Sequence, residues 1–599
     1  MGAFKSAVIT KKGQALLAKV VAGTTTLNFT NIKVSEQVLS GDLASLTGIG
    51  TVKQTEKVAS VIRQNTSNVK VSASFSNQNL TAGYYVRNIG LYATDPQDGE
   101  ILYSISVADE TTATADWMPP FNGIGVSSLL VDLVTAVSNA SSVSITVDPS
   151  AGATVAQIVN LQGQIDDVRS FVGYEEDDIY GVEVDYANKK FTRIAGAEHL
   201  VQGSAFSALS PWDRKRCILS DGGVVLAYRG ETGYVETGKL TTAVTKTIKG
   251  VETTFPVGTV VQVMVEQPIF YTKVVPIKSK TATSGRGKQG TITRYYISPI
   301  PKVGFKAPEV FYDDKGNLQD KIYLSAYEGS LCTKGSYNTT DVTVTDTDFK
   351  NTVLSSIAGA KPASGLGTNL TRAVAREFAI TRGAGWKLHN IFALSVTQWL
   401  ILVEYASFNA QSSIGQGVST FTDDGTSNMS LVTGATAGIG NGSGIPDGGT
   451  DGKCSVTYRG EENLWGNIWT WLDGVNIYNT ADESTAYVKA NGTMVDDKRT
   501  DYTPVEFGLV KTEGYISAFG VANENNELFL PTEHSGTSAL PVSDYIWNNN
   551  TGWRVARLGG WWIDGAICGP WCLYLTHASF DRSRHFGGRL LYVPQSTAV

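Results

Sequence analysis

The chain contains several residue types that could support catalysis, but their spacing matches no common catalytic or metal site. Cys568 and Cys572 have only His577 nearby as a base, and free cysteines are more often small buried apolar residues. Residues 285–289 pair Gly with Lys but lack the Ser or Thr that completes a phosphate-binding loop. Residues 423–428 offer oxygen ligands without the closing Glu of a calcium loop. We therefore expect no catalytic residue, no metal and no cofactor, and a protein that is not an enzyme.

Residues 553–593 have the composition of a binding surface. This segment holds eight aromatic residues among 41, against 10% aromatic residues in the whole chain. Five arginines and two aspartates give it a net charge of +3, opposite in sign to the −7 of the chain. Aromatic and arginine side chains are the usual anchors of binding interfaces. We predict partner contacts at Ile563, Asp564, Ile567, Cys572, Tyr574, Thr576, His577, Phe580, Asp581, Arg582, Ser583, Arg584, His585 and Phe586, with Trp561 and Trp571 as flanking contacts.

Glycine, tryptophan and leucine residues recur between these candidate contacts. They form the pattern Arg557-x-Gly-Gly-x-Trp562-x-x-Gly565-Ala566-x-Cys568-Gly569-Pro570, followed by Leu573-x-Leu575 and Gly587-Gly588-Arg589-Leu590. This pattern resembles the variable region of proteins that are diversified by diversity-generating retroelements. The resemblance implies a C-type lectin fold for residues 318–599, in which the side chains between the frame residues vary. The frame residues would be Trp562, Gly565, Gly569 and Leu575.

The amino-acid content of the segment agrees with this resemblance. In that family, adenines of a template are replaced, mostly within Asn codons, and such codons cannot become Lys, Glu, Gln, Met or Trp. Residues 553–593 contain no Lys, Glu, Gln, Met or Asn, and their Trp residues would then belong to the frame or come from other codons. Residues 322–328 and 460–471 also resemble the formylglycine-generating-enzyme branch of the same fold. That branch uses a cysteine site to which Cys568 and Cys572 do not correspond, so its activity is not carried over.

Two short motifs near the N-terminus resemble phage tail-fibre and tail-collar proteins. Residues 9–16 read ITKKGQAL, and residues 87–92 read RNIGLY. The resemblance implies that residues 1–150 form a domain that attaches to phage tail or baseplate proteins. Residues 179–317 are similar to the middle segments of retroelement-diversified tail proteins, and we expect them to form a β-rich spacer domain.

Apolar residues at heptad spacing predict a helix between these two domains. They recur at intervals of three and four residues, as at the a and d positions of a coiled coil. An isolated helix of this length is marginal in water, which favours an oligomeric coil over a helix packed on its own domain, although both interpretations stay open. Residues 151–178 are therefore predicted to join three chains as a homotrimer through Ile158, Leu161, Ile165, Val168 and Val172.

Charge and hydropathy restrict the partners of the protein. The net charge of −7 argues against a broad nucleic-acid-binding surface. No apolar run approaches the roughly 20 residues that span a bilayer, so we expect no membrane insertion. The N-terminus lacks the apolar core of a secretory signal, which favours synthesis in the host cytoplasm.

The expected fold class is multidomain α+β, mostly β. Helical periodicity predicts helices over residues 6–21, 371–380 and 389–408, and alternation predicts a strand over residues 68–75. The expected order is an N-terminal tail-attachment domain, a short coiled coil, a β-rich middle domain and a C-terminal C-type-lectin-like domain. Their boundaries are 1–150, 151–178, 179–317 and 318–599.

These expectations together predict a phage tail fibre protein, located in the virion tail, that attaches to a host cell-surface receptor. The receptor could be a protein or a glycan, and three copies of the tip would add avidity. Two alternatives stay open. One is a tail-associated enzyme acting on host surface glycan, which is expected to carry paired carboxylates on a repetitive β-solenoid that this sequence lacks. The other is a bacterial surface adhesin with the same diversified fold, against which the tail-like N-terminus argues.

Overall fold

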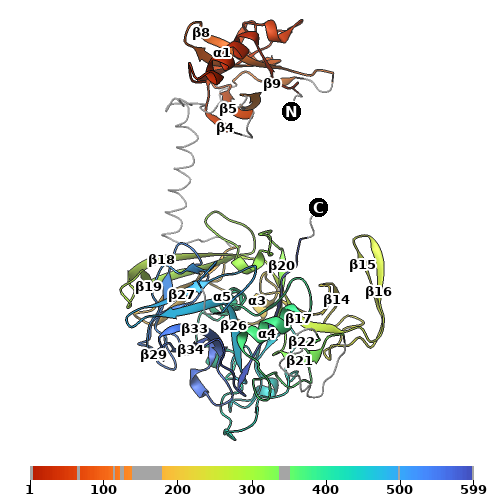
Figure 1. Ribbon diagram of the computed structural model, residues 1–599, viewed down its shortest axis with the longest axis vertical. Coiled ribbons are helices and arrows are strands. Elements are labelled where there is room, and N and C mark those ends of the chain that lie inside the picture. The colour runs from red at the N-terminus through yellow and green to blue at the C-terminus, as the bar shows by residue number, and fades with distance from the viewer. Residues whose placement is uncertain are drawn as a thin grey trace. The chain divides into compact units, whose positions relative to one another are not determined.

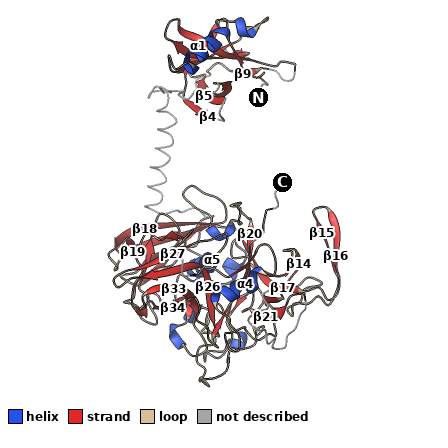
Figure 2. Ribbon diagram, viewed as in Figure 1, coloured by secondary structure: helices blue, strands red, loops and turns tan. Residues whose placement is uncertain are grey.

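The computed structural model describes residues 4–63, 68–111, 115–121, 127–137, 178–335, 351–496 and 499–596. The chain divides into two compact units, Met1–Ile165 and Asp166–Val599, which are described separately below. The protein is mostly β, with 39% strand and 11% helix, which confirms the expected fold class (Figure 2). The predicted trimer seam, with Ile158, Leu161, Ile165, Val168 and Val172, lies outside the described residues.

The first unit places one helix against a curved set of strands. Helix α1 (Lys11–Val21) begins later than residue 6, because the side chain of Thr10 caps it by accepting a hydrogen bond from the Gly13 N–H at 3.0 Å. The residues before the cap form strand β1 (Val8–Ile9), which pairs with β8 (Gly99–Val107). The predicted helix was therefore right in place and too long at its N-terminal end.

The strands of the first unit form a five-stranded, a three-stranded and a two-stranded sheet. The five-stranded sheet runs β1-β8-β7-β2-β3, with β7 (Asn88–Asp95), β2 (Phe29–Ser35) and β3 (Val52–Lys57). The three-stranded sheet runs β10-β5-β4, with β10 (Ser128–Ala136), β5 (Asn68–Ser76) and β4 (Ser60–Arg63). The third pairs β6 (Tyr84–Val86) with β9 (Asp116–Met118). Strand β5 confirms the strand predicted from alternation over residues 68–75.

The second unit is built on three main sheets, mostly antiparallel, that surround a buried helix (Figure 1). One sheet has the order β14 (Val225–Tyr228), β13 (Lys215–Ser220), β17 (Val261–Pro268), β20 (Lys321–Ser325), β36 (Leu590–Tyr592) and β23 (Trp386–Leu388). A second joins β12 (Lys190–Ala195), β11 (Tyr180–Asp185), β19 (Lys288–Ser298), β30 (Ala518–Val521) and β31 (Pro531–Glu533), with β18 (Tyr271–Thr281) on β19.

The third sheet carries the C-terminal segment. Its order is β28 (Thr503–Pro504), β27 (Ser484–Val488), β26 (Trp469–Asn479), β33 (Gly552–Gly559), β34 (Gly569–His577), β32 (Tyr545–Trp547) and β29 (Glu513–Tyr515). The short strand β35 (Phe586–Gly587) pairs in parallel with β26. Smaller hairpins pair β15 (Val244–Ile248) with β16 (Val251–Phe255), β21 (Ser330–Thr333) with β22 (Thr352–Ser355), and β24 (Thr457–Tyr458) with β25 (Glu461–Glu462).

The structure differs from the expected division at residue 317. Strand β17 from the middle segment pairs with β20, and β19 pairs with β30, so strands on both sides of residue 317 share two sheets. The first five residues of β17 are all buried, so neither face of this part of the strand is exposed to solvent. The described middle segment therefore belongs to the same hydrophobic core as residues 318–599 and is not a separate spacer.

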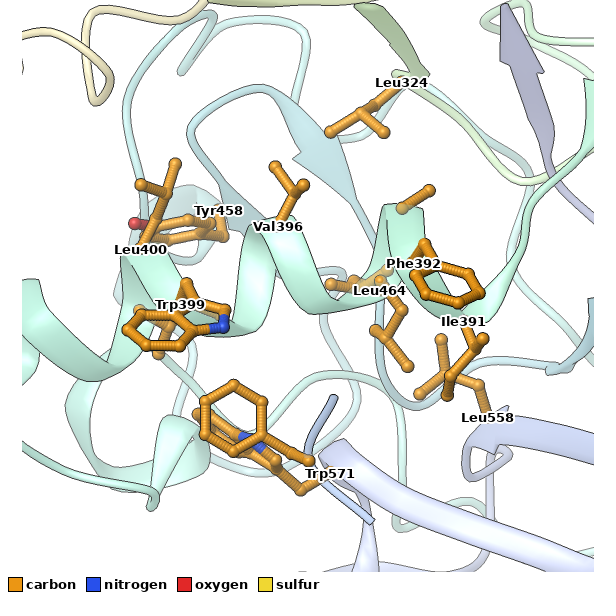
Figure 3. Packing of buried hydrophobic residues seen from close by; sticks show 14 of the residues in the cluster. Leu324, Ile391, Phe392, Val396, Trp399, Leu400, Tyr458, Leu464, Leu558 and Trp571 are labelled. Carbon is orange, nitrogen blue, oxygen red and sulfur yellow. The ribbon is translucent and has the colours of Figure 1, made fainter. Parts of the chain in front are cut away.

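Helix α5 (Ile391–Tyr405) forms the centre of that core (Figure 3). All its residues except Tyr405 are buried, as expected for a helix that is apolar around its whole circumference. Asn390 caps its start by accepting the Ala393 N–H at 2.8 Å, and Ala406 ends it in the left-handed conformation. Helix α4 (Arg372–Ile380) lies against β22 and β23. Both helices confirm the predictions over residues 389–408 and 371–380, with ends shifted by one to three residues.

Candidate functional site

A pocket of about 520 Å³ lies at one side of the third sheet and is formed largely by the C-terminal segment. It brings together eight of the fourteen predicted contacts and the flanking Trp561. The lining residues are Trp469, Trp547, Arg557, Trp561, Asp564, Tyr574, His577, Asp581, Arg582, Ser583, His585 and Phe586. Its volume lies within the range of about 300–1,000 Å³ that is usual for small-ligand sites.

Strand pairing explains how residues far apart in the sequence meet in this pocket. Arg557 on β33 is in register with Trp471 on β26 and with Tyr574 on β34. Trp547 on β32 is also in register with Tyr574, and their rings stack with centroids 4.9 Å apart. The sheet thus fixes one wall of the pocket, which is mostly aromatic.

Arg557 lies at the base of the pocket, enclosed by aromatic rings. Its guanidinium carbon is 3.6 Å from the ring centre of Phe586, 4.3 Å from that of Tyr574 and 4.9 Å from that of Trp469. The residue is 1% exposed, and burial lowers its pKa to about 9. Its Nε and Nη1 atoms are buried and have no hydrogen-bond partner among the described residues. The rings stabilise the cation through their faces but provide no acceptor for its N–H groups.

Asp564 is held in place by the tryptophan at the pocket wall. The backbone N–H of Trp561 donates to Asp564 Oδ2 at 3.2 Å, and its indole Nε1 donates to Oδ1 at 2.8 Å. Burial raises the pKa of this carboxyl to about 7, a rise that these hydrogen bonds and the charge of Arg557 oppose. At neutral pH the carboxyl is therefore a mixture of protonated and ionised forms.

Two histidines line the pocket and stay neutral at physiological pH. His577 Nδ1 lies 2.8 Å from Asp581 Oδ2, and His585 Nδ1 lies 2.9 Å from Ser583 Oγ. Burial, reinforced by the positive charge of Arg557, lowers their pKa values to about 4 and about 3. These rings act as hydrogen-bonding and stacking surfaces, and they add no positive charge to the pocket.

The outer rim of the site is the exposed part of the same segment. Phe580 is 75% exposed and Ile563 is 38% exposed, which makes them the large apolar side chains available to a partner. Arg582 is exposed and donates to the side-chain oxygen of Asn369. Ile567 and Thr576 are half-buried and do not line the pocket.

Two of the predicted residues are corrected by their burial. Cys572 and the flanking Trp571 are both 0% exposed and belong to hydrophobic core clusters, so neither side chain reaches a partner. Phe586 is 3% exposed and serves as the surface on which the Arg557 guanidinium lies. The cause is that β34 buries both of its faces near its start, so alternation along the strand does not separate core from contact residues.

Arg584 is also corrected, because it is already paired within the chain. Its Nη2 forms an ion pair with Asp423, and its Nη1 donates to the Ser427 backbone oxygen at 2.7 Å. Asp423 additionally accepts the indole N–H of Trp562 at 3.2 Å. Arg584 therefore ties the long loop of residues 415–452 to the C-terminal segment and is not free to pair with an acidic group on a receptor.

The predicted frame residues lie where a fixed scaffold requires them. Trp562 is 0% exposed and Leu575 is 1% exposed. A Cβ added at Gly569 would lie 2.1 Å from both carboxylate oxygens of Asp544, so only glycine fits there. Gly565 has a φ of +60°, which favours glycine. The chemical identity of these four positions is thus required by packing and backbone geometry.

Sequence reasoning missed three lining residues. Trp469 and Trp547 come from strands outside residues 553–593, and only the pairing of the sheet brings them to the pocket. Arg557 was read as part of the frame pattern. Its position on a strand with buried neighbours was the available signal, because a buried arginine must find a partner or a function.

Comparison with known proteins supports a tail role for the first unit. Residues 1–156 match the family model described as phage tail-collar fibre protein, N-terminal. No curated protein matches the chain. The family match supports a phage tail fibre role and a place in the virion tail for this protein. Among the described residues, no helix is long and apolar enough to cross a bilayer.

Proposed function

We propose that the protein is a phage tail fibre that attaches the virion to a host cell-surface receptor through the pocket of the second unit. The single observation that carries the proposal is that the C-terminal segment, whose composition predicted a binding surface, provides most of the lining of one aromatic pocket. The tail-collar match supports attachment of residues 1–156 to tail or baseplate proteins. Binding sites that combine exposed aromatic residues with arginine are typical of recognition surfaces.

The proposal is tested by binding of the purified full chain to host cells. Phe580→Asp places a charge at the most exposed apolar residue of the rim, and we expect it to reduce cell binding at least tenfold without unfolding the protein. Val251→Asp is the matched control, since Val251 is 64% exposed on the β15–β16 hairpin. Equal binding by the Phe580 variant, the control and the wild type would show that the exposed rim does not contact the receptor.

We further infer that residues 553–593 are diversified on a C-type-lectin-like scaffold and that the chain is a homotrimer. The contrast between a packed frame and half-buried residues between its members supports the first inference. Sequencing of the gene from a propagated phage population tests it. Substitutions should concentrate at positions such as Ile563, Phe580 and Arg582 and spare Trp562 and Gly569. An invariant segment would contradict it, and sedimentation of the purified chain tests the trimer.

A tail-associated glycan hydrolase is the second candidate, and one observation favours it. Asp564, whose pKa is raised to about 7, shares the pocket with Asp581, and glycosidases use a protonated carboxyl beside an ionised one. Asp581 is already engaged by His577 and by the Ala578 N–H at 2.9 Å, which argues for a positioning role. Release of reducing ends from host surface glycan, abolished by Asp564→Asn, would establish the enzyme. Binding without release supports the receptor-binding proposal.

A further inference from the structure

The pocket contains a buried cation that makes ring contacts but has two N–H groups without a hydrogen-bond partner among the described residues. Arg557 is 1% exposed, and its buried Nε and Nη1 atoms make no hydrogen bond to any described residue. Burying an unpaired charge is costly, and buried arginines are normally matched by a carboxylate or by several carbonyl oxygens. Arg557 also lines the pocket, so the part of its guanidinium that faces the cavity is suited to receive an acceptor from outside the chain.

The two carboxylates of the pocket do not supply that acceptor. Asp564 accepts both of its hydrogen bonds from Trp561, and Asp581 accepts from His577 and the Ala578 N–H. Neither forms an ion pair with Arg557 among the described residues, although both contribute to the electrostatic environment of its guanidinium. The charge of Arg557 is therefore only partly compensated from within the pocket.

The walls around Arg557 indicate the shape of the missing group. Trp547 and Trp561, which are partly exposed, provide ring surfaces on which a flat, mostly apolar face can lie. Asp581, Ser583 and Arg582 line the same pocket and provide acceptors and donors for hydroxyl groups. This combination, with a volume of about 520 Å³, fits one or two sugar rings and is too small for a folded element of a protein receptor.

We infer that the pocket binds a sugar residue that carries a carboxylate, with the carboxylate directed at the Arg557 guanidinium and the ring against the tryptophan wall. Arginine and carboxylate form the strongest hydrogen bonds available to such a ligand, and the aromatic enclosure orients the guanidinium plane before binding. This inference rests on the proposed receptor-binding function and specifies its ligand as an acidic glycan. An acidic protein loop is the competing occupant and is an outcome of the test.

The first arm of the test compares ligands on the wild-type full chain by titration calorimetry. The probes are glucuronate, galacturonate and N-acetylneuraminate, each paired with a neutral counterpart: glucose, galactose and the methyl ester of N-acetylneuraminate. We expect at least one acidic sugar to bind at least tenfold more tightly than its neutral counterpart. Equal binding within every pair, or binding only of a glutamate-containing peptide, would overturn the inference.

The second arm uses variants of Arg557. Arg557→Gln removes the charge and should abolish the preference for the acidic member of the pair, while Arg557→Lys should keep part of it. Arg499→Gln is the charge-matched control, because Arg499 is exposed and distant in sequence from the pocket residues. If Arg557→Gln does not fold, Arg557→Met, which also removes the charge, replaces it, and loss of the preference for the acidic sugar is the expected result. An unchanged preference in the folded Arg557 variant would overturn the role of this residue.

Failure of this inference and failure of the proposed function give different results. If Phe580→Asp loses binding to host cells while acidic sugars neither bind nor compete with the cells, the receptor-binding function stands and the acidic-sugar ligand is wrong. If the rim variant and Arg557→Gln both bind cells like the wild type, both proposals are wrong. Competition for cell binding by the preferred acidic sugar, lost in Arg557→Gln, supports both.

Discussion

Arg372 and Arg557 are two of the buried arginines of the second unit, and they differ in how their hydrogen-bond donors are satisfied. At α4, Arg372 donates to the backbone oxygens of Leu472 and Val475 at 3.1 and 2.7 Å and to Asp496. In the pocket, Arg557 is equally buried and has no such partner among the described residues. The comparison teaches that a completed network is part of the fold, whereas an incomplete one marks a place where a ligand can complete it.

The largest expected effect is the loss of the α4 network. Arg372→Ala removes one of the two arginines paired with Asp496 and leaves two backbone oxygens without their buried donor, so we expect the free energy of unfolding to fall by about 3–5 kcal/mol. Denaturant unfolding followed by tryptophan fluorescence measures this change, with Arg499→Ala as the exposed control. A loss below about 1 kcal/mol would show that the network is not needed for stability and would weaken the comparison.

Asp544 is the acidic counterpart of Arg557. It is buried and accepts hydrogen bonds, but it has no ion pair among the described residues. It accepts the Trp571 N–H at 2.7 Å, and burial raises its pKa to about 8. The folded state therefore holds a proton that the unfolded state has released, so stability falls as pH rises toward 8. The pKa values of His577 and His585 are lowered, so the titration of these histidines changes stability only below about pH 6.5.

We expect Asp544→Asn to reduce the pH dependence of stability between pH 6.5 and 8, with the remainder due to Asp564, Glu328 and Glu527, whose pKa values burial also raises into this range. Across this window the wild type should lose about 1–2 kcal/mol of stability that the variant keeps, because each pKa unit corresponds to roughly 1.4 kcal/mol. Thermal unfolding across this pH window measures the slope, and Asp482→Asn, at an exposed position, should leave it unchanged. A slope that is the same in both variants would mean that Asp544 is ionised in the folded protein.

Arg557→Met tests the pocket half of the comparison. Methionine has a similar volume and no charge, so the variant loses cation–π contacts but also removes the buried unpaired donors. We expect stability to stay within about 1 kcal/mol of the wild type or to rise, in contrast to Arg372→Ala, and binding to host cells to be lost. A destabilisation comparable to that of Arg372→Ala would assign Arg557 to the fold.

Phe580→Ala should have the smallest effect on stability, within about 0.5 kcal/mol, because the side chain is 75% exposed. Cell binding should still fall about tenfold, as expected when an aromatic anchor is removed from an interface. Parallel melting and cell-binding curves separate the two effects. Unchanged binding would place the receptor contact deeper in the pocket.

Local patterns predicted much of the secondary structure. The apolar run that became α5 and the alternation that became β5 are encoded within short segments, so periodicity was sufficient. The division at residue 317 could not be predicted, because the pairing of β17 with β20 joins segments about 60 residues apart and leaves no local signal.

The site was predictable in composition but not in detail. The aromatic and arginine content of residues 553–593 indicated the segment, while Cys572 and Tyr574, two residues apart on β34, differ in exposure for reasons that lie in neighbouring strands. The tryptophans of β26 and β32 reach the pocket only through sheet pairing. The state of Arg557 depends on which acceptors are absent around it, and that property belongs to the folded arrangement.

The most direct test of the central claim is competition for infection by the purified full chain. Wild-type protein should occupy the receptor and block phage adsorption to host cells, whereas Arg557→Met, folded and at least nearly as stable, should fail to block it. Blocking by both proteins at the same concentration would contradict the claim that this pocket binds the receptor.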